Sequence, residues 1–328
     1  MRPTVSTVVV LLICCFSVAC GHISPKETGT QESPGLYVLQ SSGVACGKDQ
    51  LPDNQKFAIE NISTALESLL ARSGDTRTII LYVHGRAAGK EEEPDKSLKD
   101  VVPCLEHECP ARVLMFFWPG AVEGGPLGFP EDQARQAAPG LGQALAGLKK
   151  YKADNGAKLL GRKFVLLTHS MGSIVLEEYL GSYKAGDLPP GLFDTVVISS
   201  SASASKDHAD WLKKTDFSSH TYVTVNDNDP IDGWAGFKEL QTRLGKKLDT
   251  LFSGNVTLAP NALYVDFSKT GVDHRYCIAS GQKGNPYIKD FFEAVLSGDS
   301  FKFDGYGGVD KVEQRNGTKI YYFKKFKK

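Results

Sequence analysis

The sequence has no excess of charge of either sign. Among its 328 residues, 38 are lysine or arginine and 38 are aspartate or glutamate, so the formal net charge is +0. Proteins that bind nucleic acid through its phosphates carry clustered positive charge. We therefore expect no nucleic-acid partner. Internal repeats and heptads are also missing, which argues against a repeat array or a long coiled coil.

The N-terminal apolar run is too short to span a membrane comfortably. It covers residues 8–13, between Arg2 and the small residues Ser17 and Ala19, a pattern typical of a cleaved signal peptide. We expect residues 1–20 to direct export and the polar residues 21–33 to form a tether. Cys20 resembles the lipidated cysteine of a bacterial lipobox. This predicts membrane attachment through Cys20, as a periplasmic or cell-envelope lipoprotein, with plain secretion as the alternative.

Cysteine is sparse, with 7 residues in the whole chain. Beyond residue 20 there are Cys46, Cys104, Cys109 and Cys277, an even number that suits disulfides in an exported protein. The short spacing predicts a Cys104–Cys109 bridge and leaves Cys46 to pair with Cys277. A zinc site at Cys104, His107 and Cys109 is the alternative, but no second ligand pair follows at finger spacing. We expect neither a metal nor a cofactor.

Strand-like and helix-like segments alternate along the chain, which predicts an α/β fold with a doubly wound, mostly parallel sheet. This domain is expected over residues 34–300. Residues 301–328 form a C-terminal extension, in which Asn316-Gly317 favours a tight hairpin turn before a basic and aromatic end. Pro139 is expected to kink or split its helix. Strands are expected at 36–39, 78–86, 112–118, 164–167, 195–198, 220–225 and 263–267, and helices at 54–70, 131–150, 210–212, 234–248 and 287–296.

The most informative stretch is residues 164–176, an apolar strand that runs into Thr168-His169-Ser170-Met171-Gly172 and then into a helix. A serine on such a strand-to-helix turn has an exposed hydroxyl, and the turn needs small neighbours such as Gly172. The turn also directs the Met171 N–H toward the place where an oxyanion would form. The alternative is a buried strand followed by a serine that only caps a helix.

A serine nucleophile on this fold requires an acid and then a histidine, each after a later strand. Three histidines follow Ser170 in the chain, namely His208, His220 and His274. His208 precedes every acid candidate, and His220 begins a strand, at the wrong end of the sheet. His274 alone lies in a loop after the last strand, which predicts it as the base.

The acid is expected after the strand 220–225, because the strand ending near residue 198 runs into serines without a carboxylate. Three aspartates follow, Asp227, Asp229 and Asp232. We choose Asp229, since Pro230 follows it in a turn able to fix the side chain, with Asp227 as the second choice. Aspartates beside proline also simply cap turns, which is the alternative for each of them.

The order of four motifs resembles the α/β-hydrolase superfamily, and within it bacterial esterase and lipase-like proteins of poorly defined function. The motifs are residues 84–85, 117–119, 168–172 and 274–276, and the resemblance covers about residues 75–298. It implies the α/β-hydrolase fold and the following roles. Ser170 is the nucleophile, His274 the base, Asp229 its orienting carboxylate, and the N–H groups of Met171 and Arg86 form the oxyanion hole.

The resemblance predicts an exported serine hydrolase that cleaves small acyl esters through an acyl-enzyme on a Ser-His-Asp triad. The alternative is a catalytically inactive exported lipoprotein of the same fold that binds or scaffolds a partner. Two further histidines are expected to be structural. His84 should lie beneath the oxyanion loop, and His169 should pack on the side of the elbow that faces away from the site.

Overall fold

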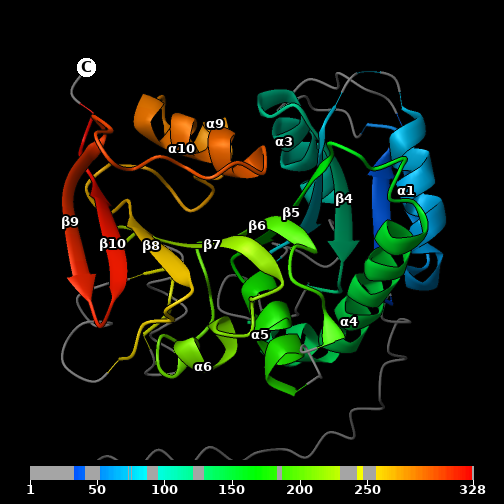
Figure 1. Cartoon of the computed structure of the whole chain (residues 1–328), viewed down its shortest axis with the longest axis horizontal. Coiled ribbons are helices and arrows are strands. Elements are labelled where there is room, and N and C mark those ends of the chain that lie inside the picture. The colour runs from blue at the N-terminus through cyan, green and yellow to red at the C-terminus, as the bar shows by residue number, and fades with distance from the viewer. Residues whose placement is uncertain are drawn as a thin grey trace, which may run out of the picture. The chain divides into compact units, whose positions relative to one another are not determined.

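The protein is described here by a computed structural model, which covers residues 33–40, 52–72, 74, 76–86, 95–120, 129–182, 187–229, 242–246 and 256–326. The chain divides into a unit of residues 1–31, which lies outside the described residues, and a unit of residues 32–328. The second unit is built on a ten-stranded sheet with the order β2-β1-β4-β3-β5-β6-β7-β8-β10-β9 (Figure 1).

Neighbouring strands from β4 through β3, β5, β6, β7 and β8 to β10 pair in parallel, and β1, β2 and β9 pair antiparallel at the two edges. The strands are β1 (Gly35–Leu39), β2 (Asn54–Phe57), β3 (Thr78–Val83), β4 (Ala111–Phe117), β5 (Lys163–His169), β6 (Phe193–Ser199), β7 (Ser218–Val225), β8 (Ala262–Asp266), β9 (Val309–Arg315) and β10 (Thr318–Phe323). The helices are η1 (Ile59–Asn61), α1 (Ile62–Ala71), α2 (Asp95–Asp100), α3 (Val102–Glu108), α4 (Glu131–Asp154), α5 (Gly172–Ser182), α6 (His208–Leu212), α9 (Ala279–Gln282) and α10 (Pro286–Leu296).

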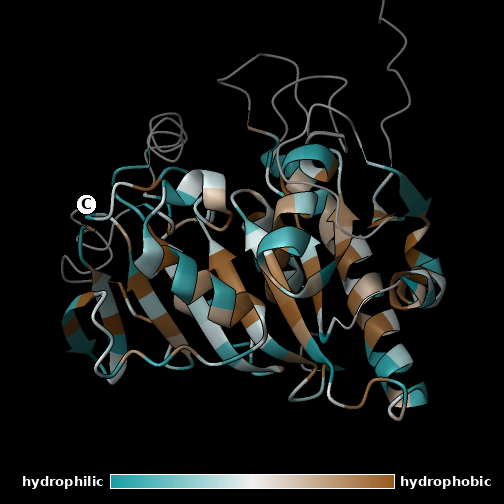
Figure 2. Ribbon diagram, turned by 90° about the horizontal axis from the view of Figure 1, so that it is seen from above, coloured by the Kyte–Doolittle hydropathy of each residue, from teal (hydrophilic) through white to brown (hydrophobic). Residues whose placement is uncertain are grey.

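The central strands are buried on both faces, because helices cover the sheet from two sides (Figure 1). In β3 every side chain is buried. Ile79, Leu81 and Val83 pack with α1, α4 and α5 in one apolar cluster, whereas Ile80 and Tyr82 pack with α3 and α10 in another. This alternation follows from the two-residue period of a strand. Figure 2 shows the central strands as hydrophobic over most of their length.

The predicted fold class, a mostly parallel α/β sheet with helices on both faces, is confirmed. Residues 309–323, which we placed in an extension outside the domain, form β9 and β10 on either side of the Asn316-Gly317 turn. Strand β10 pairs in parallel with β8, so the sheet continues through the C-terminal segment and does not stop near residue 300. Of the helices in the described ranges, none is both long and apolar enough to cross a membrane.

Three predicted helices differ from the structure. The segment predicted as one helix over 54–70 begins as edge strand β2 and becomes helical only from Ile59. Helix α4 is continuous across Pro139, so Pro139 does not split the helix, and the kink stays a prediction. Proline lacks the N–H that would donate a helical hydrogen bond at this position. The close packing of α4 against Ile59 offsets that loss, since a Cβ on Gly140 would lie only 2.9 Å from Ile59 Cδ1. The helix predicted over 234–248 falls mostly outside the described residues, and its described part, 242–246, is not helical.

Neither predicted disulfide is present. Cys109 and Cys277 are buried free thiols, and Cys104 is disulfide-bonded to neither of them. The Cys104–Cys109 expectation assumed a loop between the two residues, but residues 102–108 form α3. Cys104 lies within α3 and Cys109 follows its last residue in extended backbone, so the helix and not a closed loop separates the two side chains.

Candidate active site

The predicted elbow lies between β5 and α5, which are separated only by Ser170 and Met171. Ser170 has a φ of 52°, in the left-handed region that L-residues other than glycine, Asn and Asp rarely adopt. Helix α5 starts directly against the end of β3, so that a Cβ on Gly172 would lie 2.6 Å from the His84 carbonyl oxygen. Only glycine fits this position without movement of the backbone.

Hydrogen bonds fix the backbone of Ser170 at both of its polar groups. The Ser170 N–H donates to the Ser199 carbonyl at 3.0 Å, and the Ser170 carbonyl accepts from the Ala202 N–H at 3.2 Å. The same carbonyl also accepts from the Ser173 hydroxyl at 2.7 Å. A residue in a sparsely populated backbone region costs ~1–3 kcal/mol, and it persists only where its surroundings fix it. These three hydrogen bonds hold the backbone of Ser170 in that region.

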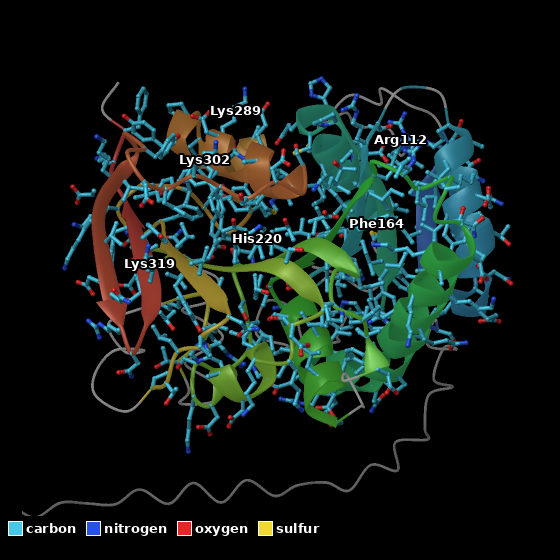
Figure 3. All side chains as sticks on the ribbon, viewed as in Figure 1. Arg112, Phe164, His220, Lys289, Lys302 and Lys319 are labelled. Carbon is cyan, nitrogen blue, oxygen red and sulfur yellow. The ribbon has the colours of Figure 1, made fainter. Side chains whose placement is uncertain are left out.

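A buried acid and a histidine meet near the carboxyl ends of β7 and β8. His274 Nδ1 lies 2.6 Å from Asp229 Oδ2, and only 8% of His274 and 1% of Asp229 are exposed. Asp227, our second choice, is held through its backbone N–H, which donates to Ser268 Oγ at 2.8 Å. Between these two aspartates, Asp229 is the one whose side chain contacts the imidazole. Asp232 lies outside the described residues. His220 is near the beginning of β7, at the opposite end of that strand (Figure 3).

The turn after β7 directs Asp229 toward His274. Asn226 is buried, its carbonyl accepts from the Asp229 N–H at 3.0 Å, and its side chain donates to the Val272 carbonyl at 3.1 Å. Asn226 therefore joins the loop that carries the acid to the loop that carries the histidine. An ionised carboxylate can only accept, so the His274 proton resides on Nδ1 and the lone pair is on Nε2. This is the tautomer that a general base requires.

The His274 loop lies directly against the elbow. The rings of His169 and His274 have centroids 4.8 Å apart, and His169 Nε2 lies 3.1 Å from the His274 carbonyl oxygen. Our prediction that His169 faces away from the site was therefore wrong, although it is buried and hydrogen-bonded as expected. Within the described residues, no hydrogen bond joins the Ser170 hydroxyl to the His274 imidazole. Such contacts are often long in structures without substrate, and they tighten when it binds.

The end of β3 forms the other wall of the elbow. A Cβ on Gly85 would lie 2.8 Å from the Ser170 Cβ, so the backbone beside Arg86 passes directly next to the serine. The Arg86 side chain is half-buried over the Phe129 ring, with 5.3 Å from Cζ to the centroid, and desolvation lowers its pKa. Met171 is buried, and within the part of the chain that the structure describes its N–H donates no hydrogen bond.

His84 is structural, as predicted. Its Nδ1 lies 2.6 Å from the Gly85 carbonyl oxygen, and its Nε2 accepts from the Trp118 N–H at 3.1 Å. Trp118 Nε1 donates in turn to the His84 carbonyl at 2.8 Å. Both residues are fully buried, and burial lowers the pKa of His84 to about 4. The neutral ring thus ties the end of β3 to the end of β4.

Two residues near the site were not assigned a role from the sequence. Ser200, directly after β6, donates its hydroxyl to the His274 carbonyl at 2.7 Å, and the Tyr276 hydroxyl accepts from the Ser200 N–H at 3.0 Å. The run Ser199-Ser200-Ser201 was noted only for its lack of a carboxylate.

In the described ranges, no group of three or more His, Cys, Asp or Glu side chains lies close enough to hold a metal ion.

No family model matches the sequence, and no curated protein matches it. Solved structures do match at low identity. An esterase from Pyrobaculum calidifontis is 15% identical with a TM-score of 0.36, and the match covers 73% of this chain and 90% of that one. Carboxyl esterase 2 from Tuber melanosporum is 15% identical with a TM-score of 0.36, and the match covers 68% and 76%. Similarities this low do not transfer an activity.

Proposed function

We propose that this protein is a serine hydrolase that cleaves small acyl esters. Ser170 would be the nucleophile, His274 the general base and Asp229 the orienting carboxylate. The observation that carries the proposal is the buried 2.6 Å contact between His274 and Asp229, in a loop that lies against the elbow of Ser170. A carboxylate behind an imidazole beside a serine on a strand-to-helix turn is the arrangement that activates a hydroxyl.

In the first half of the reaction, His274 Nε2 accepts the Ser170 proton while the serine oxygen attacks the acyl carbon. The N–H groups of Met171 and Arg86 then stabilise the negative charge on the former carbonyl oxygen. When the tetrahedral intermediate collapses, the imidazolium returns the proton to the departing alkoxide. This step releases an alcohol and leaves the acyl group on Ser170.

In the second half, water replaces the serine as nucleophile. Its proton goes to His274 Nε2, and its oxygen attacks the acyl carbon. Collapse of this intermediate frees the carboxylic acid and returns the proton to Ser170. Asp229 stays ionised throughout and stabilises the imidazolium that forms twice in the cycle.

The deciding experiment combines activity with active-site labelling. The purified protein is assayed on short-chain p-nitrophenyl esters and treated with a fluorophosphonate probe, which reacts only with an activated serine. We expect labelling at Ser170, and loss of turnover by ~10³-fold or more in Ser170→Ala. Ser182→Ala is the matched control, because Ser182 ends α5 and is exposed. A Ser170→Ala protein with wild-type turnover would exclude the proposed nucleophile.

We do not favour the alternative of an inactive binding or scaffolding protein. Such a role would not require a buried aspartate in contact with a histidine beside the Ser170 elbow. The labelling experiment separates the two functions. A protein that hydrolyses no short ester but reacts with the probe has a narrow substrate range. A folded protein that does neither is the scaffold.

We also infer that the protein is exported and attached to a membrane through a lipidated Cys20. The support is the sequence pattern alone, since residues 1–32 lie outside the described residues. In a bacterial host, we expect the wild-type chain in the membrane fraction with a mature N-terminus at Cys20, and Cys20→Ala in the soluble fraction. An unprocessed N-terminus on mass spectrometry would reject both inferences.

A further inference from the structure

The backbone of His274 is held by two side chains that the proposed mechanism does not use. Its carbonyl oxygen accepts from Ser200 Oγ at 2.7 Å and lies 3.1 Å from His169 Nε2. His169 ends β5, one residue before the nucleophile, and Ser200 directly follows β6. Both donors are buried. A surface loop does not need two buried side chains to bind a single carbonyl oxygen. This arrangement therefore suggests a role in the position of the base that the loop carries.

We propose that His169 and Ser200 are positioning residues, which set the place of the His274 imidazole relative to Ser170 by holding the His274 carbonyl. We call this pair of residues the carbonyl clamp. The proposal rests on the proposed hydrolase function, because it assigns a role within that reaction. Neither residue touches the reacting atoms, so their effect must pass through His274.

Ser200 binds the histidine loop at two points. Besides the bond to His274, its N–H donates to the Tyr276 hydroxyl at 3.0 Å, and that hydroxyl lies 3.2 Å from the Thr224 carbonyl. Ser200 itself has a φ of 48°, so its backbone is held in an unfavourable conformation. Strain of this kind is retained where the surrounding contacts require it. Here it turns both the N–H and the hydroxyl of one residue toward the same loop.

His169 serves the clamp only with a proton on Nε2, since a carbonyl oxygen accepts and never donates. Burial, and then the neighbouring His274, lower the pKa of His169 to about 3, so it stays neutral in the pH range of the reaction. The charged groups that act on it are Asp229, which favours the cation, and Arg275, which opposes it. The neutral ring carries a single proton, and the contact with the His274 carbonyl oxygen selects Nε2 as its position.

The clamp and the nucleophile share the same two strand ends. His169 is the register partner of Ser199 in the β5–β6 pair, and the Ser170 N–H donates to the Ser199 carbonyl. Consequently a shift of β6 against β5 would move the serine and its base together. Without the clamp, the loop would still be held at Val272 and Tyr276, but no side chain would hold the backbone carbonyl of His274 itself. A misplacement of about 1 Å costs ~10²-fold in rate, whereas substrate binding is unaffected.

The test compares His169→Phe, which fills the space without a donor, with His169→Gln, whose amide nitrogen can reach the position of Nε2. We expect His169→Phe to lower kcat by ~10- to 100-fold with KM unchanged within about twofold, and His169→Gln to recover most of the loss. Ser200→Ala removes the other donor and should lower kcat in the same way. The double variant should lose less than the product of the two single losses, because both donors act on one carbonyl.

His208→Phe is the matched control. His208 is also a fully buried histidine, its Nδ1 lies 2.6 Å from a backbone carbonyl, that of Ser205, and it belongs to α6. Its replacement should destabilise the fold to a similar degree without a selective fall in kcat. A fall in kcat of the same size in His208→Phe would mean that the His169 effect reflects general destabilisation, which would overturn the proposal.

A measurement that needs no turnover separates this proposal from the hydrolase assignment. The proton between His274 Nδ1 and Asp229 should give a low-field NMR resonance, which we expect to be broadened in His169→Phe and Ser200→Ala and retained in His169→Gln and His208→Phe. If folded His169→Phe and Ser200→Ala both keep this resonance sharp, the clamp is wrong, whatever the enzyme does. An inert Ser170 with the expected NMR pattern would instead reject the hydrolase function alone.

Discussion

Acid should destabilise this protein through two histidines that are buried in the neutral form. Burial holds the pKa of His84 at about 4 and that of His169 at about 3, against 6.5 for the exposed group. Between these values the unfolded chain binds more protons than the native state, so stability is complete above about pH 6.5 and falls as the pH drops. At about pH 4.5, each histidine removes roughly 2–3 kcal/mol, and the pair removes about 5 kcal/mol.

This loss is large beside the ~5–15 kcal/mol that stabilises a typical domain. Two half-buried carboxyl groups oppose it, because desolvation raises the pKa of both Glu108 and Glu177, and each then stabilises the native state as the pH falls. The contribution of one histidine is therefore best isolated by difference. His84→Gln keeps an acceptor for the Trp118 N–H but cannot be protonated, so it removes one titration and leaves the opposing carboxyl groups in place.

The assay is urea unfolding, followed by tryptophan fluorescence, at about pH 7.5 and about pH 4.5. We expect His84→Gln to be less stable than wild type at the higher pH. Between the two pH values, however, its free energy of unfolding should fall by roughly 2–3 kcal/mol less than that of wild type. An identical pH dependence in the two proteins would mean that burial does not hold His84 neutral.

Three further predictions concern the site. Asp229→Asn should lower kcat by ~10⁴-fold with little change in the stability measured by thermal unfolding, because the amide can hold the imidazole in the wrong tautomer; a loss below tenfold would count against Asp229 as the orienting group. Ser173→Ala deletes the hydroxyl bond to the Ser170 carbonyl together with the bonds that Ser201 and Ser203 donate to the same hydroxyl, so it should cost more than the ~1 kcal/mol of a single bond in urea unfolding, and a smaller loss would count against this network. Gly172→Ala should abolish probe labelling of Ser170 or prevent folding, because its Cβ would lie 2.6 Å from the His84 carbonyl oxygen, and a folded, fully labelled variant would contradict the elbow geometry.

The elements that the sequence predicted correctly are those whose information is local. The central strands read as continuous apolar runs, and the elbow reads as strand, serine, glycine and helix within a few residues. The order of strands then limited the candidate partners and led to His274 and Asp229, whose catalytic roles stay predictions. In the structure these two side chains are 2.6 Å apart, although they are separated by 45 positions in the chain.

The predictions that were wrong depended on contacts between distant residues or on one pattern that fits two structures. The contact of His169 with the backbone of residue 274, which lies 105 positions further along, leaves no trace in the local pattern. The helix predicted over 54–70 rested on apolar residues from Ile59 onward, and it was extended too far toward the N-terminus, because pairing with β1 makes residues 54–57 an edge strand. The Cys104–Cys109 spacing suited a loop disulfide only so long as the intervening residues were not helical.

Whether Ser170 is an activated nucleophile can be measured by labelling with a fluorophosphonate probe followed by peptide mass spectrometry. We expect one modified peptide, which contains Ser170, no modification in Ser170→Ala, and much slower modification in Asp229→Asn. A folded wild-type protein that stays unmodified at Ser170, or one modified equally fast when Asp229 is replaced, would contradict this expectation.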